Sequence, residues 1–82
     1  MSCHIMVVKI EARREDSPQV QEILSRFGCS IRARLGLHET RDVCSDEGIL
    51  ILQLDGDVSE MEKLEDALNE MDRVKAKLVV LD

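Results

Sequence analysis

The sequence has almost no aromatic residues: Phe27 is the only one, and tryptophan and tyrosine are absent. Proteins that bind unpaired bases use aromatic side chains as stacking surfaces, so a base-stacking nucleic-acid site is excluded. Hydrophobic residues nevertheless make up 44% of the chain, and four of them are methionine. The core must therefore be aliphatic, with methionine filling irregular spaces.

Cysteine is also scarce, occurring only as Cys3, Cys29 and Cys44. The number is odd, the spacing is wide and no CxxC pair is present, which argues against a disulfide framework. We expect free thiols in a reducing compartment, and hence a cytoplasmic protein. Cys29 follows a helix-ending glycine and lies two positions before Ile31, on the same predicted core side, which predicts a small buried side chain.

Long apolar runs and an excess of positive charge are missing as well. No apolar run approaches the roughly 20 residues of a membrane-spanning helix, so we expect no membrane partner. The 17 acidic residues outnumber the 11 basic ones, giving a net charge of −6. Because DNA affinity depends on clustered lysine and arginine, we expect no direct nucleic-acid binding. The length leaves room for a single domain, residues 1–82.

Alternating hydrophobicity predicts strands over residues 4–12, 30–37, 49–55 and 74–81. The polar stretch 38–47 between the second and third strands is typical of a hairpin loop.

Two segments have helical periodicity instead. In the first, Val20, Ile23 and Leu24 share a face. Ser17 followed by Pro18 predicts its start, with serine as the N-cap and proline at the first helical position. The second helix is predicted to begin at Asp57, which forms a capping box with Glu60.

The resulting order is strand, helix, strand, strand, helix, strand, in two halves of similar pattern over residues 4–37 and 49–81. This α+β order predicts a ferredoxin-like βαββαβ sandwich, with a four-stranded antiparallel sheet and two helices on one face. The first and third strands should be central. The edge strands carry cations that discourage further strand pairing, namely Arg32, Arg34, Lys75 and Lys77.

Alternate residues of each strand should face the helices and form the core. On the second strand these core positions are Ile31, Ala33 and Leu35. The positions that face away from the helices are apolar too. They are Ile5, Val7, Ile49, Ile51, Val79 and Leu81, flanked by Arg32, Arg34, Lys75 and Lys77. An apolar patch with a polar rim is typical of an interface, so we expect a homodimer or higher homo-oligomer through this face. The alternative is a monomer with scattered surface aliphatics.

Three segments carry a family resemblance: VQEILSRFGCSIRARLGL at 20–37, EGILILQLDGD at 47–57 and VKAKLVV at 74–80. With them the whole chain resembles the small bacterial ACT-like family of iron-only hydrogenase system regulators. That family usually has a glycine before the last strand, where this chain has Asp72 and Arg73. The resemblance implies an ACT-like domain that oligomerises through its sheet and senses a small molecule in connection with hydrogenase expression or maturation.

The resemblance also implies a ligand site, because ACT domains that bind amino acids hold them near the first strand–helix loop, beside a second copy. The matching residues are Arg13, Arg14, Asp16 and Ser17. An arginine there could clamp a carboxylate, and the helix N-terminus could receive an anion. The alternative is a solvated loop with an ordinary cap, which Gln19 favours because many effector sites have glycine after the proline.

His4, His38 and Cys44 form a possible metal site, by analogy with the related domain of the nickel-responsive regulator. The ligand types suit nickel, iron or zinc, but no short paired spacing supports them. We therefore expect no resident cofactor.

Acylphosphatases share this strand–helix order and use an arginine with an asparagine. The only asparagine, Asn69, lies within the second helix, so the arginine–asparagine pair of an acylphosphatase is missing. We therefore expect that the chain is not an enzyme. Two hypotheses remain: a ligand-sensing oligomer and a module that binds only a protein partner.

Overall fold

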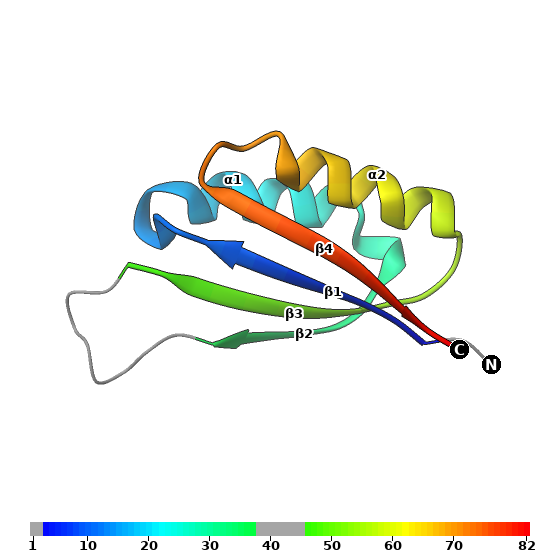
Figure 1. Ribbon diagram of the computed structural model, residues 1–82. Helices are drawn as coiled ribbons and strands as arrows, with labels where there is room; N and C mark the ends of the chain where they lie inside the picture. Colours follow the sequence, from blue (N-terminus) through cyan, green and yellow to red (C-terminus); the bar gives the residue numbers. More distant parts are fainter. Residues whose placement is uncertain (1–2, 38–45) are drawn as a thin grey trace.

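The computed structural model describes residues 3–37 and 46–82 and confirms the ferredoxin-like fold (Figure 1). Its elements are β1 (Cys3–Ile10), α1 (Arg13–Arg26), β2 (Ile31–Leu37), β3 (Gly48–Leu54), α2 (Val58–Asn69) and β4 (Val74–Leu81). A turn of 3₁₀ helix, Gly28–Ser30, joins α1 to β2. Neither helix in this part of the chain is long and apolar enough to cross a membrane.

The sheet has the strand order β2-β3-β1-β4, so β1 and β3 are central as predicted. All three pairings are antiparallel, and Met6 of β1 lies opposite Leu52 on one side and Leu78 on the other. Both helices cover the same face (Figure 1). The face of the sheet away from them is called the open face below.

The core lies between the helices and the covered face of the sheet. It contains Met6, Val8, Ile10, Val20, Ile23, Leu24, Leu52, Leu54, Met61, Leu64, Leu68 and Val74. Seven of these side chains are completely inaccessible to solvent: Met6, Val8, Val20, Leu52, Met61, Leu64 and Leu68. These twelve buried residues include no aromatic side chain, and Phe27 packs against them partly buried.

The predicted start of the first helix is wrong. Helix α1 begins at Arg13, and Pro18 lies inside it. The cap comes from the residues before β3: Arg13 N–H donates to the Asp46 carbonyl at 2.7 Å, and Arg14 N–H donates to Asp46 Oδ1 at 3.0 Å. Helix α2, in contrast, begins where the sequence predicts, with the Asp57 carboxylate accepting the Ser59 N–H at 2.9 Å. The predicted capping box does not form, because the Glu60 carboxylate contacts Lys63 instead of the Asp57 backbone.

The predicted facing of β2 is also wrong. The register shifts between Ile31, opposite Leu54, and Ala33, opposite Gln53, so Arg32 is the additional residue of a β-bulge. Beyond the bulge each side chain faces the opposite way from the prediction, because one inserted residue exchanges the two faces.

The bulge therefore moves Ala33 and Leu35 from the expected core to the open face. Leu35 is 56% exposed and Leu37 47% exposed. Arg34 lies opposite the buried Leu52, on the helix side rather than on the open face. Cys29 is exposed on the 3₁₀ turn, so its predicted burial is wrong as well.

Candidate functional site

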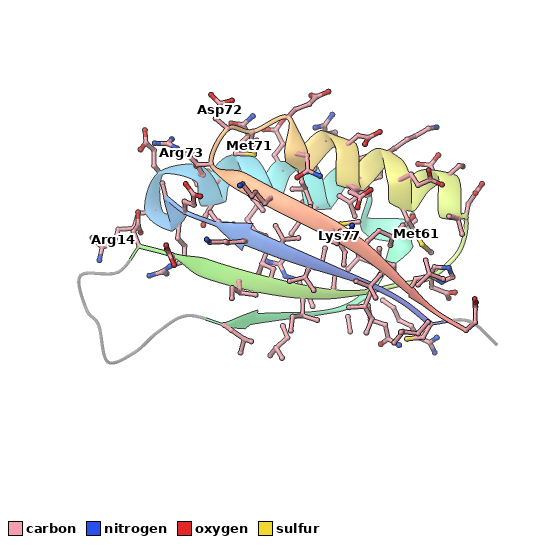
Figure 2. The ribbon with its side chains drawn as sticks, viewed as in Figure 1. Arg14, Met61, Met71, Asp72, Arg73 and Lys77 are labelled. Atoms are coloured by element: carbon pink, nitrogen blue, oxygen red, sulfur yellow. The ribbon has the colours of Figure 1, made fainter. Side chains whose placement is uncertain are left out.

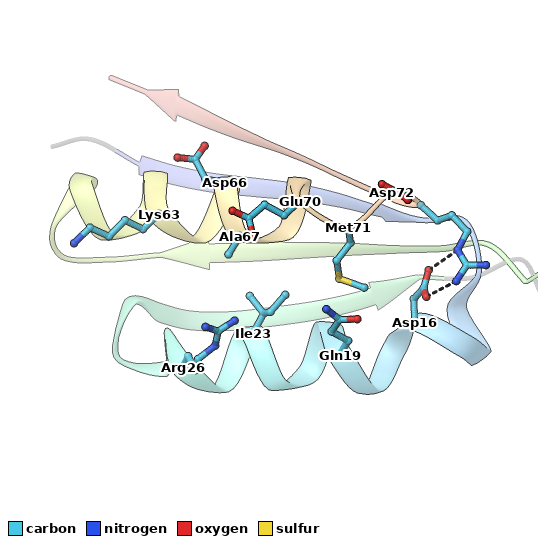
Figure 3. A pocket seen from close by; sticks show the side chains of 11 residues that line it. Asp16, Gln19, Ile23, Arg26, Lys63, Asp66, Ala67, Glu70, Met71 and Asp72 are labelled. Atoms are coloured by element: carbon cyan, nitrogen blue, oxygen red, sulfur yellow. Dashed lines mark hydrogen bonds and ion pairs between the residues drawn. The ribbon is translucent and has the colours of Figure 1, made fainter.

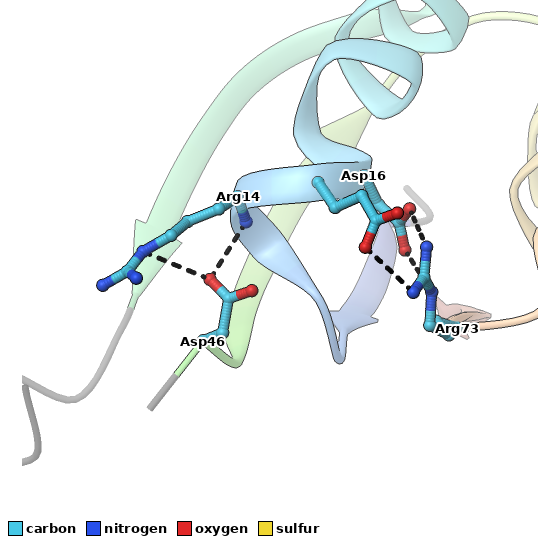
Figure 4. A network of polar contacts seen from close by, with 5 residues as sticks. Arg14, Asp16, Asp46 and Arg73 are labelled. Carbon is cyan, nitrogen blue, oxygen red and sulfur yellow. Dashed lines mark hydrogen bonds and ion pairs between the residues drawn. The ribbon is translucent and has the colours of Figure 1, made fainter. Parts of the chain in front are cut away.

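The N-terminal end of α1 lies beside the start of β3, and a polar contact joins them. Arg14 Nε lies 3.7 Å from Asp46 Oδ1, which also accepts the Arg14 backbone N–H (Figure 4). An anion at a helix N-terminus is stabilised by the free N–H groups and the helix dipole. In this structure the anion is the chain's own Asp46.

A second contact fixes the opposite side of α1. Arg73, in the connection from α2 to β4, donates to both oxygens of Asp16, from Nε at 3.1 Å and Nη2 at 2.8 Å (Figure 4). Its Nη1 donates to Glu15 at 3.1 Å. The hydrogen bonds to Asp16, and after them those to Glu15, raise the pKa of Arg73 above its ordinary value. Asp16 is 8% exposed and is therefore a structural anchor.

Where α1 meets β2 and β3 lies a cavity of about 220 Å³, called the Arg13 cavity below. Arg13, Ser17 and Gln21 line it from successive turns of α1, and the backbones of Gly36 and Gly48 line it from β2 and β3. Arg13 Nε is inaccessible to solvent and has no hydrogen-bond partner among the described residues. The cavity thus combines an unsatisfied cationic donor with neutral polar groups and with the aliphatic side chains of Ile10, Leu37, Ile49 and Leu50.

Gly48 leaves space for the Arg13 side chain in this cavity. A Cβ atom there would lie 2.9 Å from Arg13 Cδ, closer than real Cβ contacts allow. The arginine side chain passes directly over the glycine backbone, which holds its guanidinium against the sheet.

A larger hollow, of about 910 Å³, lies between α1 and α2 and is called the interhelical groove. Ile23 of α1 and Ala67 of α2 point toward one another across it, and Met71 completes its apolar floor (Figure 3). Arg26 and Lys63 lie toward one end and Asp72 toward the other (Figure 3).

The open face is apolar over most of its area, and side chains project from it below the sheet in Figure 2. Leu35, Ile51, Val7 and Lys77 form one row across the four strands, and Leu37, Ile49, Lys9 and Lys75 form the next. Ile5, Val79 and Leu81 continue the surface toward the other end of β1 and β4. The bulge in β2 thus adds two leucines to the six aliphatic residues that the sequence predicts here.

No family model matches the chain, and no curated protein matches it in sequence. Among solved structures, an uncharacterized protein from Thermotoga maritima matches with a TM-score of 0.85 at 25% identity, covering 100% of both chains. The ACT domain from the GTP pyrophosphokinase of Chlorobium tepidum matches with a TM-score of 0.69 at 16% identity, over 96% of this chain and 97% of that one.

A nitrogen regulatory PII-like protein from Thiomonas intermedia K12, solved with ADP, AMP and bicarbonate bound, has a TM-score of 0.65 at 8% identity. That match covers 100% of this chain and 97% of the other. The fold is that of ACT and PII-like domains.

Within this ACT-like fold, the four predicted ligand-site residues separate into two pairs. Arg13 and Ser17 line the Arg13 cavity, whereas Arg14 pairs with Asp46 and Asp16 pairs with Arg73. Sequence reasoning missed Gln21, which follows Arg13 and Ser17 at the same i, i+4 spacing. That spacing is a usable signal only when the helix is known to begin at Arg13.

Of the predicted metal ligands, His4 lies near the start of β1, opposite Leu54 and Val80. His38 and Cys44 lie outside the described residues. Within residues 3–37 and 46–82, no three histidine, cysteine or acidic side chains are grouped closely enough to hold a metal ion.

Proposed function

We propose that this chain is a ligand-sensing regulatory module that binds a small anionic molecule in the Arg13 cavity. The buried Nε of Arg13, with no partner among the described residues, carries the proposal. A buried donor without a partner lowers stability, and a carboxylate or phosphate oxygen would supply the missing hydrogen bond. The nucleotides and bicarbonate bound by the PII-like protein support small anions as ligands of this fold.

The chemistry of the cavity favours binding over catalysis. Ser17 and Gln21 offer a hydroxyl and an amide to a ligand, and the glycine backbones leave space for it. Among the described residues, the lining contains no carboxylate, imidazole or thiol that would transfer a proton or attack a substrate. We therefore place the chain among binding modules rather than enzymes.

A thermal-shift screen over amino acids, nucleotides and divalent metal ions tests this proposal. A ligand that binds only the folded chain adds about 2.7 kcal/mol of stability at a hundred times its Kd. We expect saturable stabilisation by anionic compounds, and its loss in Arg13→Gln. In Gly48→Ala we expect weaker stabilisation, because the new Cβ displaces Arg13 without removing its charge.

Arg32→Gln is the matched control, because it removes one exposed cation at the bulge, outside the cavity. Equal loss of stabilisation in Arg13→Gln and Arg32→Gln would show a general charge effect and reject the Arg13 site. Stabilisation by none of the compound classes would favour a module that binds only protein. Stabilisation by nickel, iron or zinc alone would favour the alternative of a metal sensor.

We also propose that the chain self-associates through the open face. Val7 and Ile49 are 39% and 43% exposed there, and Leu35 and Leu37 adjoin them through Ile51 and Ile49. A contiguous apolar surface of this kind on a small domain is typical of an interface. Because these side chains are already about half buried, covering them in a dimer would contribute about half of the roughly 1.5–3 kcal/mol that full burial of each provides.

Light scattering on Ile49→Ser with Ile51→Ser tests the association. We expect a dimer or higher oligomer for the unmodified chain and a monomer for the double variant. Val58→Ser removes an exposed aliphatic residue from the start of α2, away from the open face, and should leave the mass unchanged. A monomeric unmodified chain at micromolar concentration would refute the interface.

The resemblance to iron-only hydrogenase system regulators supplies the physiological context of the proposal. We place the sensed ligand in the control of hydrogenase expression or maturation in the cytoplasm. The test is hydrogenase activity in host cells that lack the gene. We expect rescue by the unmodified chain and by Arg32→Gln, but not by Arg13→Gln; unchanged activity in the deletion strain would reject this context.

A further inference from the structure

The charges at the end of α2 are opposite to those that stabilise a helix. The last turn contains Asp66 and has no basic residue, Glu70 is the C-cap, and Asp72 follows. A helix C-terminus carries partial negative charge, so nearby carboxylates destabilise it and cations stabilise it. Local arrangements that lower stability are typical of functional surfaces.

Two of the three cations that line the groove are engaged elsewhere within the described chain, and the third, Arg26, lies toward the end away from Asp72 (Figure 3). Arg73 binds Asp16 and Glu15, and Lys63 lies 3.2 Å from Glu60. Among the described residues, neither Glu70 nor Asp72 has a hydrogen bond or ion pair through its side chain. Both line the interhelical groove, so the groove presents negative charge to any occupant.

The groove also offers apolar contacts. Ile23 is only 3% exposed, and Ala67 and Met71 are half-buried beside it. A small alanine leaves space between the helices, and methionine adapts to differently shaped apolar side chains. An occupant therefore needs an apolar side chain as well as positive charge.

The two ends of the groove carry different charges, and this difference fixes the direction in which an occupant binds. Arg26 and Lys63 lie toward one end, and Asp72 lies toward the other, beside the Asp16–Arg73 pair (Figure 3). A segment with lysine or arginine on only one side of its apolar anchor would match this pattern in a single orientation. Complementary charge at a rim sets the orientation and rate of association.

We propose that the interhelical groove binds a short basic segment of a partner protein, with an apolar side chain over Ile23, Ala67 and Met71. A lysine or arginine beside that anchor pairs with Glu70, whose carboxylate lies near Ala67, and another, on the Asp72 side of the anchor, pairs with Asp72 (Figure 3). The groove lies on the helix side of the molecule, and the open face lies on the opposite side of the sheet. The groove shares no lining residue with the Arg13 cavity or the open face, so an occupant of the groove leaves both of them accessible.

The test uses fluorescein-labelled peptides with a leucine anchor flanked on one side by lysines, by glutamates or by serines. Anisotropy should give a Kd for the lysine peptides about tenfold lower than for the serine peptides, with no binding of the glutamate peptides. Amide shifts in ¹⁵N-labelled protein should include Ala67 and Met71. Glu70→Lys with Asp72→Lys should raise the Kd at least about tenfold, because opposed charges replace complementary ones.

The matched control is Glu22→Lys with Glu62→Lys, which makes the same change in net charge at exposed positions outside the groove lining. We expect its Kd to stay within about twofold of the unmodified chain. Because Glu70→Lys places a cation at a helix C-terminus, the groove variant should melt no lower than the unmodified chain, so weaker binding cannot reflect unfolding.

Equal weakening in both double variants would show attraction by net charge alone and overturn the proposal. Amide shifts confined to β1–β4 would place the peptides on the open face and overturn it as well. A change of oligomeric mass in Glu70→Lys with Asp72→Lys would identify a second copy as the occupant, which also contradicts it.

Discussion

At the scale of single residues, the sequence predicts contacts that are local and misses those that are distant. The Asp57 cap is local, because its partner Ser59 is two positions away. Asp46 caps α1 from 32 positions along the chain, and Arg73 reaches Asp16 across 57. No capping rule or periodicity connects residues so far apart. As a result, Arg14 and Asp16 have the residue types of a ligand site but are engaged in structural contacts.

The Asp57 cap gives a pH-dependent prediction. Hydrogen bonds from Ser59, first its backbone N–H and then its hydroxyl, lower the pKa of Asp57 below its ordinary value of 3.8. A carboxyl whose pKa is lower in the folded chain contributes stability that is fully present above the unfolded value. That stability is lost as the pH falls through the folded value.

We therefore expect Asp57→Ala to melt about 4–8 °C below the unmodified chain at pH 7, measured by circular dichroism. The difference should shrink below about pH 3.8. Asp57→Asn keeps a hydrogen-bond acceptor and should remain close to the unmodified chain at neutral pH. A difference between Asp57→Ala and the unmodified chain that stays constant from neutral to acid pH would contradict the prediction.

At the scale of elements, periodicity predicts the order and pairing of the strands but not the bulge in β2. Ile31, Ala33, Leu35 and Leu37 alternate without interruption, so the sequence pattern itself gives no sign of an inserted residue. The bulge at Arg32 exchanges the faces after Ile31. The sheet tolerates the exchange because β2 is an edge strand, and its leucines then enlarge the apolar open face.

The bulge predicts different contributions to stability from Leu35 of β2 and Leu52 of β3. Leu35 lies opposite Ile51 on the open face, whereas Leu52 lies opposite Arg34 on the covered face. Leu35→Ala should lower the free energy of unfolding of the monomer by less than about 1 kcal/mol, because the side chain is more than half exposed. Leu52→Ala in the core should cost about 2–5 kcal/mol. Urea unfolding of both, in the Ile49→Ser and Ile51→Ser background, measures the monomer alone. Equal costs would place Leu35 in the core and contradict the register.

At the scale of the whole molecule, the sheet separates two surfaces of different character. The helix side carries the acidic end of α2 and the interhelical groove, and the open face carries aliphatic rows that end in Lys9, Lys75 and Lys77. Lys9 and Lys75 lie directly opposite each other, and like charges in that position are destabilising. So small a domain has little surplus stability, and burial of the open face would add to it.

Self-association makes stability depend on protein concentration, because a dimer dissociates as it unfolds. Tenfold dilution changes the free energy of unfolding by about 1.4 kcal/mol per dimer, shared between two chains. For domains of this size, that shift lowers the melting temperature by about 3–6 °C. Differential scanning calorimetry at two concentrations measures it directly.

Ile49→Ser with Ile51→Ser should melt at one temperature whatever the concentration, since it has no interface to lose. The Glu70→Lys and Asp72→Lys variant should keep the full dependence, because the groove lies on the other side of the sheet. A concentration-independent melting temperature in the unmodified chain would mean that the open face stays solvated. The aliphatic rows would then need a different protein to cover them, since exposed contiguous patches of this kind are rare on monomers.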